Sequence, residues 1–273
     1  QSNETVLDVG SGNAPNWRAN FLCDKFAADA TERLGSALPP HAGRPFVVGD
    51  ALRLPFRDHA FDFVVCSHVL EHVEDPLRML GELSRVARRG YLETPSRVWE
   101  KLHSWPYHRW LVSQEAGRLV LEPKSAPVLE PELSEWIAQQ VATEPLFQRL
   151  WMRYWEYGLA MQYWWAGEIP AEVREGAVLT DEFVKSVLPE KADDAVPPPP
   201  TTGMMARLDS TYGRWLRRNS QPRLLDWLGL LACPMCRGSL RRADNAEALT
   251  CVGCKASYPV HEDVPILIEE AIL

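Results

Sequence analysis

A short apolar strand that runs directly into a glycine-rich turn constrains the fold of this 273-residue sequence most strongly. Residues 6–12 read VLDVGSG, with the acid Asp8 placed ahead of Gly10, Ser11 and Gly12. Glycine lets the backbone turn sharply and approach a ligand that a Cβ atom would block. The strand, the Gly-x-Gly turn and the acid predict a nucleotide-type site at the carboxyl end of the first strand of an open α/β sheet.

The turn differs from a dinucleotide-binding loop. Such a loop needs a third glycine and a helix N-terminus that holds the pyrophosphate. Here Pro15 stands at the third glycine position, and the sequence reaches the next strand almost at once. Asp8 would also repel a pyrophosphate. The loop therefore favours a ligand with cationic groups and no phosphate, such as S-adenosylmethionine, which carries an ammonium and a sulfonium.

Further strands with acids at their ends follow in order. Phe21–Asp24 ends in a carboxylate suited to ribose hydroxyls, Phe46–Asp50 ends in another, and Phe61–Cys66 is a strongly apolar strand, as a buried parallel strand should be. Asp75 and Pro76 are typical of a helix start, and this helix is predicted to run to about Arg88, before a fifth strand over 91–94.

Over roughly residues 4–125 this pattern resembles the class I S-adenosylmethionine-dependent methyltransferases of type 11. The resemblance implies that the glycine turn packs against the amino-acid and ribose portions of the cofactor. It also implies that Asp50 and Ala51 hold the adenine amino group. The segment after the fourth strand, which includes Ser67 and His68, would lie beside the transferred methyl. The expected cofactor-binding residues are Asp8, Gly10, Ser11, Gly12, Asp24, Asp50, Ala51, Ser67 and His68.

Three side chains after the fourth strand are candidate catalytic groups. His68, Glu71 and His72 would serve as a base if the methyl acceptor must lose a proton. Alternatively, His72 caps the following helix and Glu71 pairs with a surface arginine. Glu93 is a further candidate. His103, Tyr107 and His108 are candidates for the mouth of a substrate site, with surface or core packing as their alternative role.

Composition limits the partners and the location. The chain has 46% hydrophobic and 24% charged residues and a formal net charge of −8, typical of a globular protein. This charge argues against broad nucleic-acid binding, which relies on clustered Lys and Arg. No apolar run has the length of a membrane span, and no signal-peptide pattern precedes the first strand. Six cysteines without such a signal indicate reduced thiols, and we expect a cytoplasmic protein.

Four of these cysteines form two C-x-x-C pairs near the C-terminus. Cys233 and Cys236 are separated by fourteen residues from Cys251 and Cys254. Two such turns supply the four thiolates of a tetrahedral Zn²⁺ site, and because all four ligands are sulfur the site would be closed and structural. Cys23 and Cys66 lie inside predicted strands and are expected to be buried packing residues.

The sequence around the cysteines resembles the small Trm112-like zinc family over about residues 224–270. The segments LLDWL, LACPMCRGSL, TCVGCKASYPV and DVPILI carry the resemblance. Proteins of that family bind methyltransferases as separate subunits, so the resemblance implies that this domain packs on its own catalytic domain and stabilises it. The alternative is a ribbon that contacts RNA, with Arg241 and Arg242 as candidate contacts.

The sequence predicts an α/β fold: a Rossmann-like class I methyltransferase sheet, a helical aromatic-rich insertion and a small C-terminal zinc-binding β domain. Residues 109–121 are expected to form the closing hairpin of the methyltransferase sheet, and residues 131–165 a helix whose tryptophans pack the core or cover a substrate. The predicted domains are residues 1–130 (methyltransferase core), 131–192 (helical region), 193–222 (Pro-rich linker with a basic segment) and 223–273 (zinc domain).

Together these features predict an S-adenosylmethionine-dependent methyltransferase that acts on a small molecule or biosynthetic intermediate. Glu93-Thr94-Pro95-Ser96 lacks the N-P-P-[YF] signature of amino-group methylation on bases or glutamine. One alternative is a tRNA, rRNA or translation-factor methyltransferase activated by its fused zinc domain. Another is a non-catalytic scaffold with the methyltransferase fold.

Overall fold

The computed structural model describes residues 4–12, 15–26, 44–151, 159–187, 224–243, 248–261 and 264–268. Contacts divide the chain into two compact units. Unit 1 comprises residues 1–65, 85–88 and 191–273, and unit 2 comprises residues 66–84 and 89–190. The zinc domain therefore belongs to the same unit as the first strands. The predicted linker over 193–203 and the basic segment over 214–218 lie outside the described residues.

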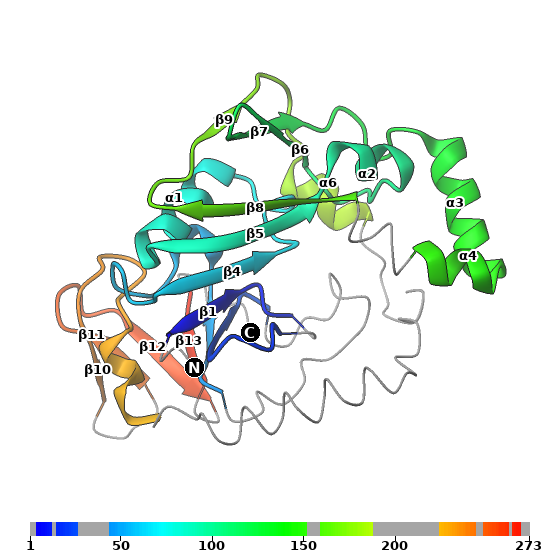
Figure 1. The fold of residues 1–273 in the computed structure, drawn as a ribbon. Helices are drawn as coiled ribbons and strands as arrows, with labels where there is room; N and C mark the ends of the chain where they lie inside the picture. The colour runs from blue at the N-terminus through cyan, green and yellow to red at the C-terminus, as the bar shows by residue number, and fades with distance from the viewer. Residues whose placement is uncertain are drawn as a thin grey trace. The chain divides into compact units, whose positions relative to one another are not determined.

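Unit 1 is built on a parallel sheet of short, buried strands (Figure 1). Its strands are β1 (Val6–Val9), β2 (Phe21–Asp24), β3 (Phe46–Gly49) and the start of β4 (Phe63–Ser67). The spatial order is β3-β2-β1-β4, and β2 pairs in parallel with both β1 and β3. All twelve residues of β1, β2 and β3 are buried, which explains why these strands are continuous apolar runs. The predicted Rossmann-like sheet is confirmed.

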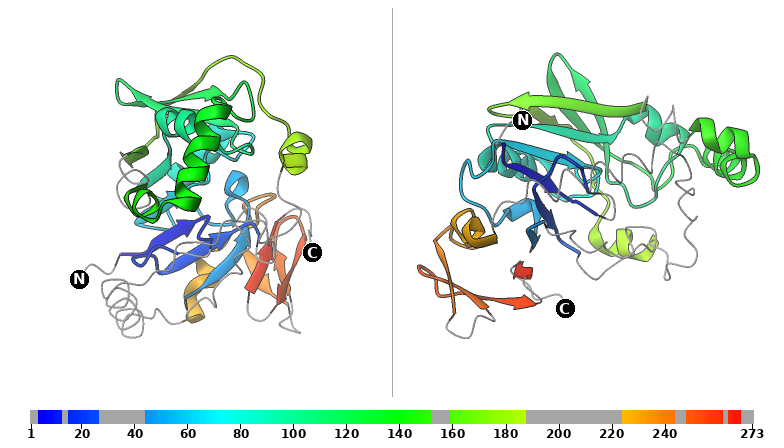
Figure 2. Two further views of the ribbon diagram at one scale, coloured as in Figure 1. Left: turned by 90° about the vertical axis from the view of Figure 1, so that its right-hand side faces the viewer. Right: turned by 60° about the horizontal axis from the view of Figure 1, so that its bottom comes forward.

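The C-terminal module continues this sheet rather than forming a separate layer. Its antiparallel strands are β10 (Leu240–Arg242), β11 (Ala248–Cys251), β12 (Ser257–His261) and β13 (Val264–Leu267). β13 then lies parallel to β3 (Figure 2). The register places Ile266 opposite Val48. Leu231 is fully buried and bridges Phe56, and Arg57 N donates to Leu230 O at 2.9 Å. Backbone pairing and apolar packing thus join the module to the methyltransferase strands.

An aromatic cluster lies under the junction. Phe21, Phe56 and Phe61 pack edge to face, with ring centroids 5.0–5.5 Å apart. Trp227, from the 3₁₀ helix η5 (Leu224–Gly229) that precedes the module, lies 6.3 Å from Phe21. Edge-to-face aromatic pairs add stability beyond their buried area. The cluster therefore combines residues of the first strands with residues of the C-terminal module.

Unit 2 contains two small β arrangements. β5 (Arg89–Pro95) pairs antiparallel with β8 (Ala160–Ala166). The hairpin of β6 (Trp110–Glu115) and β7 (Arg118–Pro123) forms a three-stranded sheet with β9 (Ala171–Val173). The hairpin is therefore confirmed, but its assignment to the methyltransferase sheet is wrong. Its two-residue turn places Ala116 and Gly117 at φ 47° and 84°, the conformation that a tight hairpin turn requires.

The helices in the described part of unit 2 are shorter than the sequence predicted. They are α1 (Pro76–Val86), which starts in unit 2, α2 (Arg97–Leu102), α3 (Pro131–Thr143), α4 (Pro145–Leu150) and α6 (Asp181–Val187). The prediction of one helix over 131–165 is wrong at its C-terminal end, because 160–166 form strand β8. Met161, Tyr163 and Trp165 are buried while Gln162 and Trp164 are exposed, the period of two of a strand.

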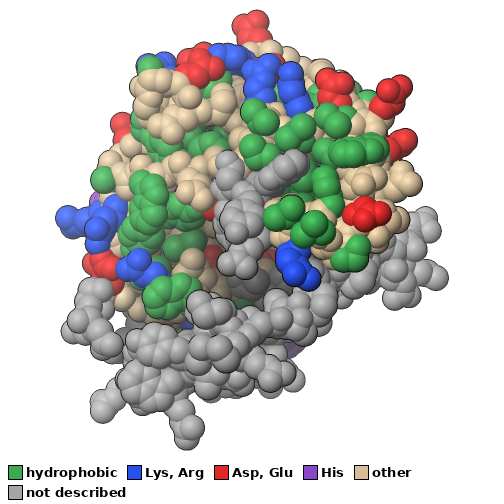
Figure 3. All heavy atoms as spheres, turned by 45° about the vertical axis from the view of Figure 1, so that its right-hand side comes forward, with side chains coloured by type: hydrophobic (Ala, Val, Ile, Leu, Met, Phe, Trp, Pro, Cys, Tyr) green, Lys and Arg blue, Asp and Glu red, His purple; other side chains and the backbone are tan. Residues whose placement is uncertain are grey.

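The tryptophans of the insertion fall into two groups. Trp151 is buried with Trp99 and Ile137, which supports the core-packing interpretation for that residue. Trp136 and Trp164 have more than half of their surface exposed. The space-filling view shows hydrophobic side chains exposed among charged ones (Figure 3). Within the described residues, no helix is both long enough and apolar enough to cross a membrane.

Candidate functional site

The glycine turn after β1 is held by the neighbouring strand. Gly10 and Gly12 have φ values of 72° and 49°, in the left-handed region that favours glycine. The amides of Gly10 and Ser11 donate to the carbonyl of Cys23, at 2.8 and 3.3 Å. Two hydrogen bonds from successive amides to one carbonyl fix the turn against the end of β2. The sequence predicted this turn. The glycines of the turn occupy the positions where a residue with a side chain would be strained.

Asp8 lies buried beneath the turn. Its side chain is 4% exposed, and Oδ2 accepts a hydrogen bond from the amide of Asn16 at 2.7 Å. Burial raises the pKa of Asp8 to about 6, against the lowering effects of this hydrogen bond and of the Arg44 charge. At neutral pH Asp8 is therefore an anion that folding has partly stripped of water. Such a carboxylate is suited to a cationic ligand.

Ser11 and Asp24 present hydrogen-bonding atoms at the same turn. Ser11 is 5% exposed, and within the described residues its Oγ has no hydrogen-bond partner. Asp24 Oδ2 accepts from the amide of Gly12 and Oδ1 from that of Phe26, each at 2.9 Å. A carboxylate is an acceptor that also suits the hydroxyls of a ribose. The residues around the glycine turn thus fit a ligand that carries ribose hydroxyls and a cationic group.

Asp50 follows β3 and is engaged on both oxygens. Oδ1 accepts from the amide of Leu52 at 2.8 Å and caps the 3₁₀ helix η2 (Ala51–Arg53), while Oδ2 pairs with Lys25 Nζ at 2.7 Å. Ala51 is buried at the first position of η2. Sequence reasoning missed Lys25, although it directly follows Asp24 at the end of β2. The ion pair places a cation between the ends of β2 and β3.

The four cysteines of the C-terminal module converge. Their sulfur atoms lie within 4.8 Å of one another, with Cys233–Cys254 at 3.6 Å and Cys236–Cys251 at 3.4 Å. Zn–S bonds of about 2.3 Å in a tetrahedron place sulfurs about 3.8 Å apart, so the set fits Zn²⁺. A Cβ on Gly238 would lie 3.1 and 3.2 Å from the sulfurs of Cys251 and Cys236, tight enough to explain glycine there.

In unit 2, His68 stands after β4 in a strained backbone conformation. Its φ is 56°, unusual for a residue with a side chain, and its amide donates to the carbonyl of Glu93 at 2.8 Å. Its ring nitrogens lie 3.4 Å from Glu71 Oε1 and 3.5 Å from Glu93 Oε1. Desolvation lowers the pKa of His68, but the two carboxylates outweigh it and raise the value to about 10. At neutral pH His68 is a cation between two anions, and not a base.

The pKa values of both Glu71 and His72 lie far below neutral pH. Burial alone would raise the pKa of Glu71, but His68 outweighs it and lowers the value to about 2. Burial, with the neighbouring His108, lowers the pKa of His72 to about 4. Glu71 is therefore ionised and His72 neutral at neutral pH. Neither group has the pKa near 7 that suits a general base.

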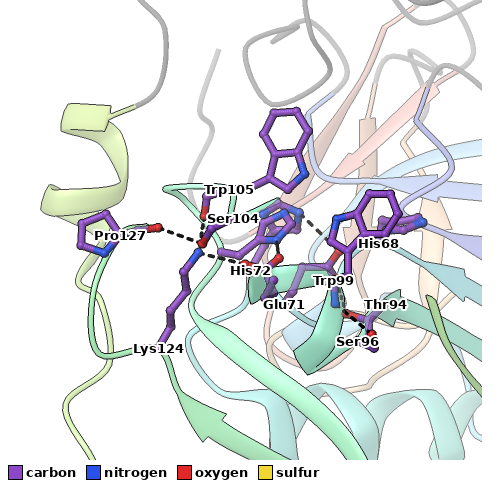
Figure 4. Close-up of polar contacts among 12 residues, drawn as sticks. His68, Glu71, His72, Thr94, Ser96, Trp99, Ser104, Trp105, Lys124 and Pro127 are labelled. Carbon is purple, nitrogen blue, oxygen red and sulfur yellow. Dashed lines mark hydrogen bonds and ion pairs between the residues drawn. The ribbon is translucent and has the colours of Figure 1, made fainter. Parts of the chain in front are cut away.

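A buried charged network lies beside these residues (Figure 4). Glu100 is fully buried, contacts His108 Nδ1 and pairs with Lys124 Nζ at 2.9 Å. Sequence reasoning missed Glu100 and Lys124, because a charged residue on a short helix or just after a strand gives no sign of burial. His108, expected at a substrate mouth, is 5% exposed and belongs to this network. The ring of Tyr107 stacks on His72 with centroids 5.7 Å apart, and His103 packs against Trp99 and Trp105.

The predicted residues fall into three groups. The glycine turn, Asp8, Asp24, Asp50 and Ala51 lie at the strand ends of unit 1, and the four cysteines lie in the C-terminal module of the same unit. Ser67, His68, Glu71 and His72 lie in unit 2. Among the residues that the structure describes, no arginine pairs with the side chain of Glu71. His72 does not cap α1, because the side chain of Asp75 accepts the amide of Arg78 at 3.0 Å there.

Two family descriptions match this chain. Residues 7–92 match the methyltransferase domain, and residues 225–263 match the Trm112p-like proteins. An uncharacterised methyltransferase of Mycobacterium marinum is 36% identical over 107 residues, covering 35% of this chain and 40% of the relative. A demethylmenaquinone methyltransferase of Streptomyces griseus is 31% identical over 90 residues, which cover 32% of this chain and 39% of the relative. The chain thus spans about two fifths of the length of these relatives.

The C-terminal part has relatives of its own. A UPF0434 protein of Dechloromonas aromatica is 40% identical over 48 residues, which cover 18% of this chain and 78% of the relative. Among solved structures, an S-adenosylmethionine-dependent methyltransferase from Mesorhizobium loti is similar with a TM-score of 0.30 and 17% identity, covering 50% of this chain and 65% of that chain.

Proposed function

We propose that this chain transfers a methyl group from S-adenosylmethionine to a small molecule or biosynthetic intermediate. The chain belongs to the Trm112p-like family through its C-terminal part. It also carries a methyltransferase domain in residues 7–92. The observation that carries the proposal is the turn after β1. There a buried anionic Asp8, the Ser11 Oγ, which has no partner among the described residues, and the Asp24 carboxylate surround a backbone fixed by glycine.

The residues present fit the cofactor. Asp24 would accept hydrogen bonds from the ribose hydroxyls, Asp50 and Ala51 would hold the adenine, and Asp8 would face the cationic amino-acid portion. When bound, the cofactor supplies a methyl group on a positively charged sulfur, which transfers by in-line displacement. The protein contributes alignment and exclusion of water, which supply much of the rate of such a reaction.

His68 is proposed to position the acceptor, not to deprotonate it. As an imidazolium between Glu71 and Glu93 it can donate a hydrogen bond to an acceptor oxygen. Both ion-pair contacts are long, at 3.4 and 3.5 Å, so the ring can reorient toward a ligand. Glu71 holds the charge of His68, and Ser67 precedes it at the end of β4. A small acceptor is supported by the relative named for demethylmenaquinone methylation.

The C-terminal module is proposed to stabilise the catalytic part through a structural Zn²⁺. Its strand β13 pairs with β3, whose end carries Asp50, so the module supports the sheet edge next to the proposed adenine site. Zinc-bound thiolates also suit the reducing cytoplasm, which we propose as the location.

Cofactor binding tests the proposal. Calorimetric titration of the full chain with S-adenosylhomocysteine is expected to give one site, and Asp24→Asn is expected to weaken it. A matched control is Asp62→Asn, which changes a carboxylate that hydrogen-bonds Thr5 and lies outside the proposed site. Failure of the wild-type chain to bind would support the non-catalytic scaffold instead.

A second candidate function is methylation of tRNA, rRNA or a translation factor, with the zinc domain as activator in cis. The Trm112p-like match over residues 225–263 favours it. Transfer of radiolabelled methyl groups to extracted quinols and small metabolites is expected, without transfer to bulk RNA or ribosomal protein. Labelled RNA or protein would replace our proposal with this one.

A further inference from the structure

Three potential metal ligands meet in unit 2, whereas the four cysteines belong to unit 1. Glu71, His72 and His108 each offer one ligand atom, and these atoms lie within 4.8 Å of one another. Glu71 Oε1 and His72 Nε2 are 3.9 Å apart, and the rings of His72 and His108 meet edge to face with centroids at 4.7 Å. Two imidazoles with one carboxylate form a donor set typical of Zn²⁺, Fe²⁺, Mn²⁺ and Co²⁺.

One atom of this set is buried without a hydrogen bond. Glu71 is 1% exposed, and within the described residues its Oε1 accepts no hydrogen bond. A buried carboxylate oxygen in that state is costly, because it has lost water and is compensated only by a long ion pair with His68. The nearest nitrogens, of His68 and His72, are 3.4 and 3.9 Å away. A cation bound by Glu71 and His72 would satisfy this oxygen.

Neighbouring side chains hold the parts of the three ligands that would not face the metal ion. Glu71 Oε2 accepts from Thr94 Oγ1 at 2.9 Å, and this leaves Oε1 facing the two imidazoles. His108 Nδ1 contacts Glu100, which is held in turn by Lys124, so Nε2 is the nitrogen left for a ligand. Tyr107 stacks on the ring of His72. Outer partners of this kind, a carboxylate on the far nitrogen of a histidine above all, orient the ligands of metal sites.

We propose that Glu71, His72 and His108 bind one divalent transition-metal ion. Bonds of about 2.1 Å place neighbouring ligand atoms about 3–3.5 Å apart, so binding requires the three side chains to close in by about 1 Å. Three protein ligands leave further coordination positions open, as in catalytic metal sites. Glu71, Glu93 and Glu100 carry three negative charges against the two positive charges of His68 and Lys124, so one negative charge is left for a bound cation to neutralise.

Binding of the metal ion does not depend on the proposed methyltransferase function, but the role that we assign to the ion rests on that function. The open positions would take an oxygen of the methyl acceptor, and this favours acceptors that carry a hydroxyl or carboxylate group. A metal ion would fix the position of that oxygen and lower the pKa of a hydroxyl group bound through it. His68, at the same carboxylate, would contact the acceptor from its own side.

Cobalt titration of zinc-loaded full chain tests the proposal. The protein is first prepared with one equivalent of zinc, measured by mass spectrometry, and then titrated with Co²⁺ by calorimetry and visible absorption. We expect one further equivalent, with weak d–d bands and no thiolate charge-transfer bands. His72→Ala and Glu71→Gln are each expected to weaken this second binding at least tenfold. Thr94→Val, which removes the hydroxyl on Glu71 Oε2, is expected to weaken it about tenfold.

The matched control is His261→Ala, which removes an exposed imidazole from β12 and is expected to leave Co²⁺ binding unchanged. The proposal is overturned if no second ion binds, or if His72→Ala and His261→Ala bind it equally. If the Glu71 or His72 variants do not fold, the wild-type cobalt protein decides by itself: its proton NMR spectrum must contain hyperfine-shifted signals from two imidazole rings. If the wild-type chain binds S-adenosylhomocysteine but no second metal ion, only the metal site is refuted. If it binds the second ion but not S-adenosylhomocysteine, only the proposed methyltransferase function is refuted.

Discussion

Asp8 gives the sharpest link between stability and function in this protein. Burial raises its pKa from the ordinary 3.8 to about 6, so folding disfavours its ionised form. At about 1.36 kcal/mol for each pH unit, this difference amounts to about 3 kcal/mol of lost stability above pH 6. We therefore expect Asp8→Asn to raise the free energy of unfolding of unit 1 by up to about 3 kcal/mol at pH 7. The asparagine oxygen can still accept from the amide of Asn16.

The sign of this effect depends on pH. Below pH 3.8 Asp8 is protonated in both the folded and the unfolded chain, so variant and wild type are expected to be equally stable. Between pH 3.8 and 6 the unfolded chain loses its proton first, and the wild type loses stability as pH rises. The advantage of Asp8→Asn is thus expected to grow over this window and to level off above it. Affinity for S-adenosylhomocysteine, which retains the ammonium, is expected to fall.

Urea unfolding at pH values from 4 to 8, followed by hydrogen exchange of the β1 amides, measures the effect in unit 1. Asp58→Asn is the control, because Asp58 is exposed and its pKa is lowered by a hydrogen bond from Arg85. The free energy of unfolding of Asp58→Asn is not expected to rise relative to wild type between pH 4 and 6. An Asp8→Asn protein no more stable than wild type at pH 7 would refute the desolvation argument. Undiminished ligand affinity would refute the role of Asp8 as partner of the ammonium.

Three further outcomes follow from the structure. Cys251→Ser is expected to release zinc, measured with a chromogenic chelator, and to lower the melting temperature of unit 1; full zinc content would contradict the four-sulfur site. Leu231→Ala is expected to cost about 2–5 kcal/mol in urea unfolding, because Leu231 is fully buried against Phe56, and a cost below 1 kcal/mol would show that the module packs loosely. Lys124→Met leaves Glu100 buried without its cation, so a loss of about 3–5 kcal/mol is expected by calorimetry, and an unchanged melting temperature would exclude an ionised Glu100.

Local sequence was sufficient wherever one short segment carries its own signal. The apolar runs of β1, β2 and β3 predicted buried parallel strands, and the turn after β1 follows from glycines that alone tolerate its φ values. The paired C-x-x-C segments likewise predicted a cluster of four sulfurs. Strand β8 was missed because Trp151, Trp155 and Met161 fall at helical spacing, and this spacing predicted helical structure as far as residue 165. Only the pairing with β5 decides for a strand.

The sequence by itself thus determined the glycine turn, the succession of the first strands along the chain and the cluster of four cysteine sulfurs, since each depends on residues close together in the chain or on a backbone conformation that few residues allow. Only the tertiary structure decided that β13 extends the sheet at β3, that Glu100 and Lys124 are buried as a pair, and that His108 meets Glu71 and His72. Burial and long-range pairing change the charge state and contacts of a side chain, and neither is encoded in the residues beside it.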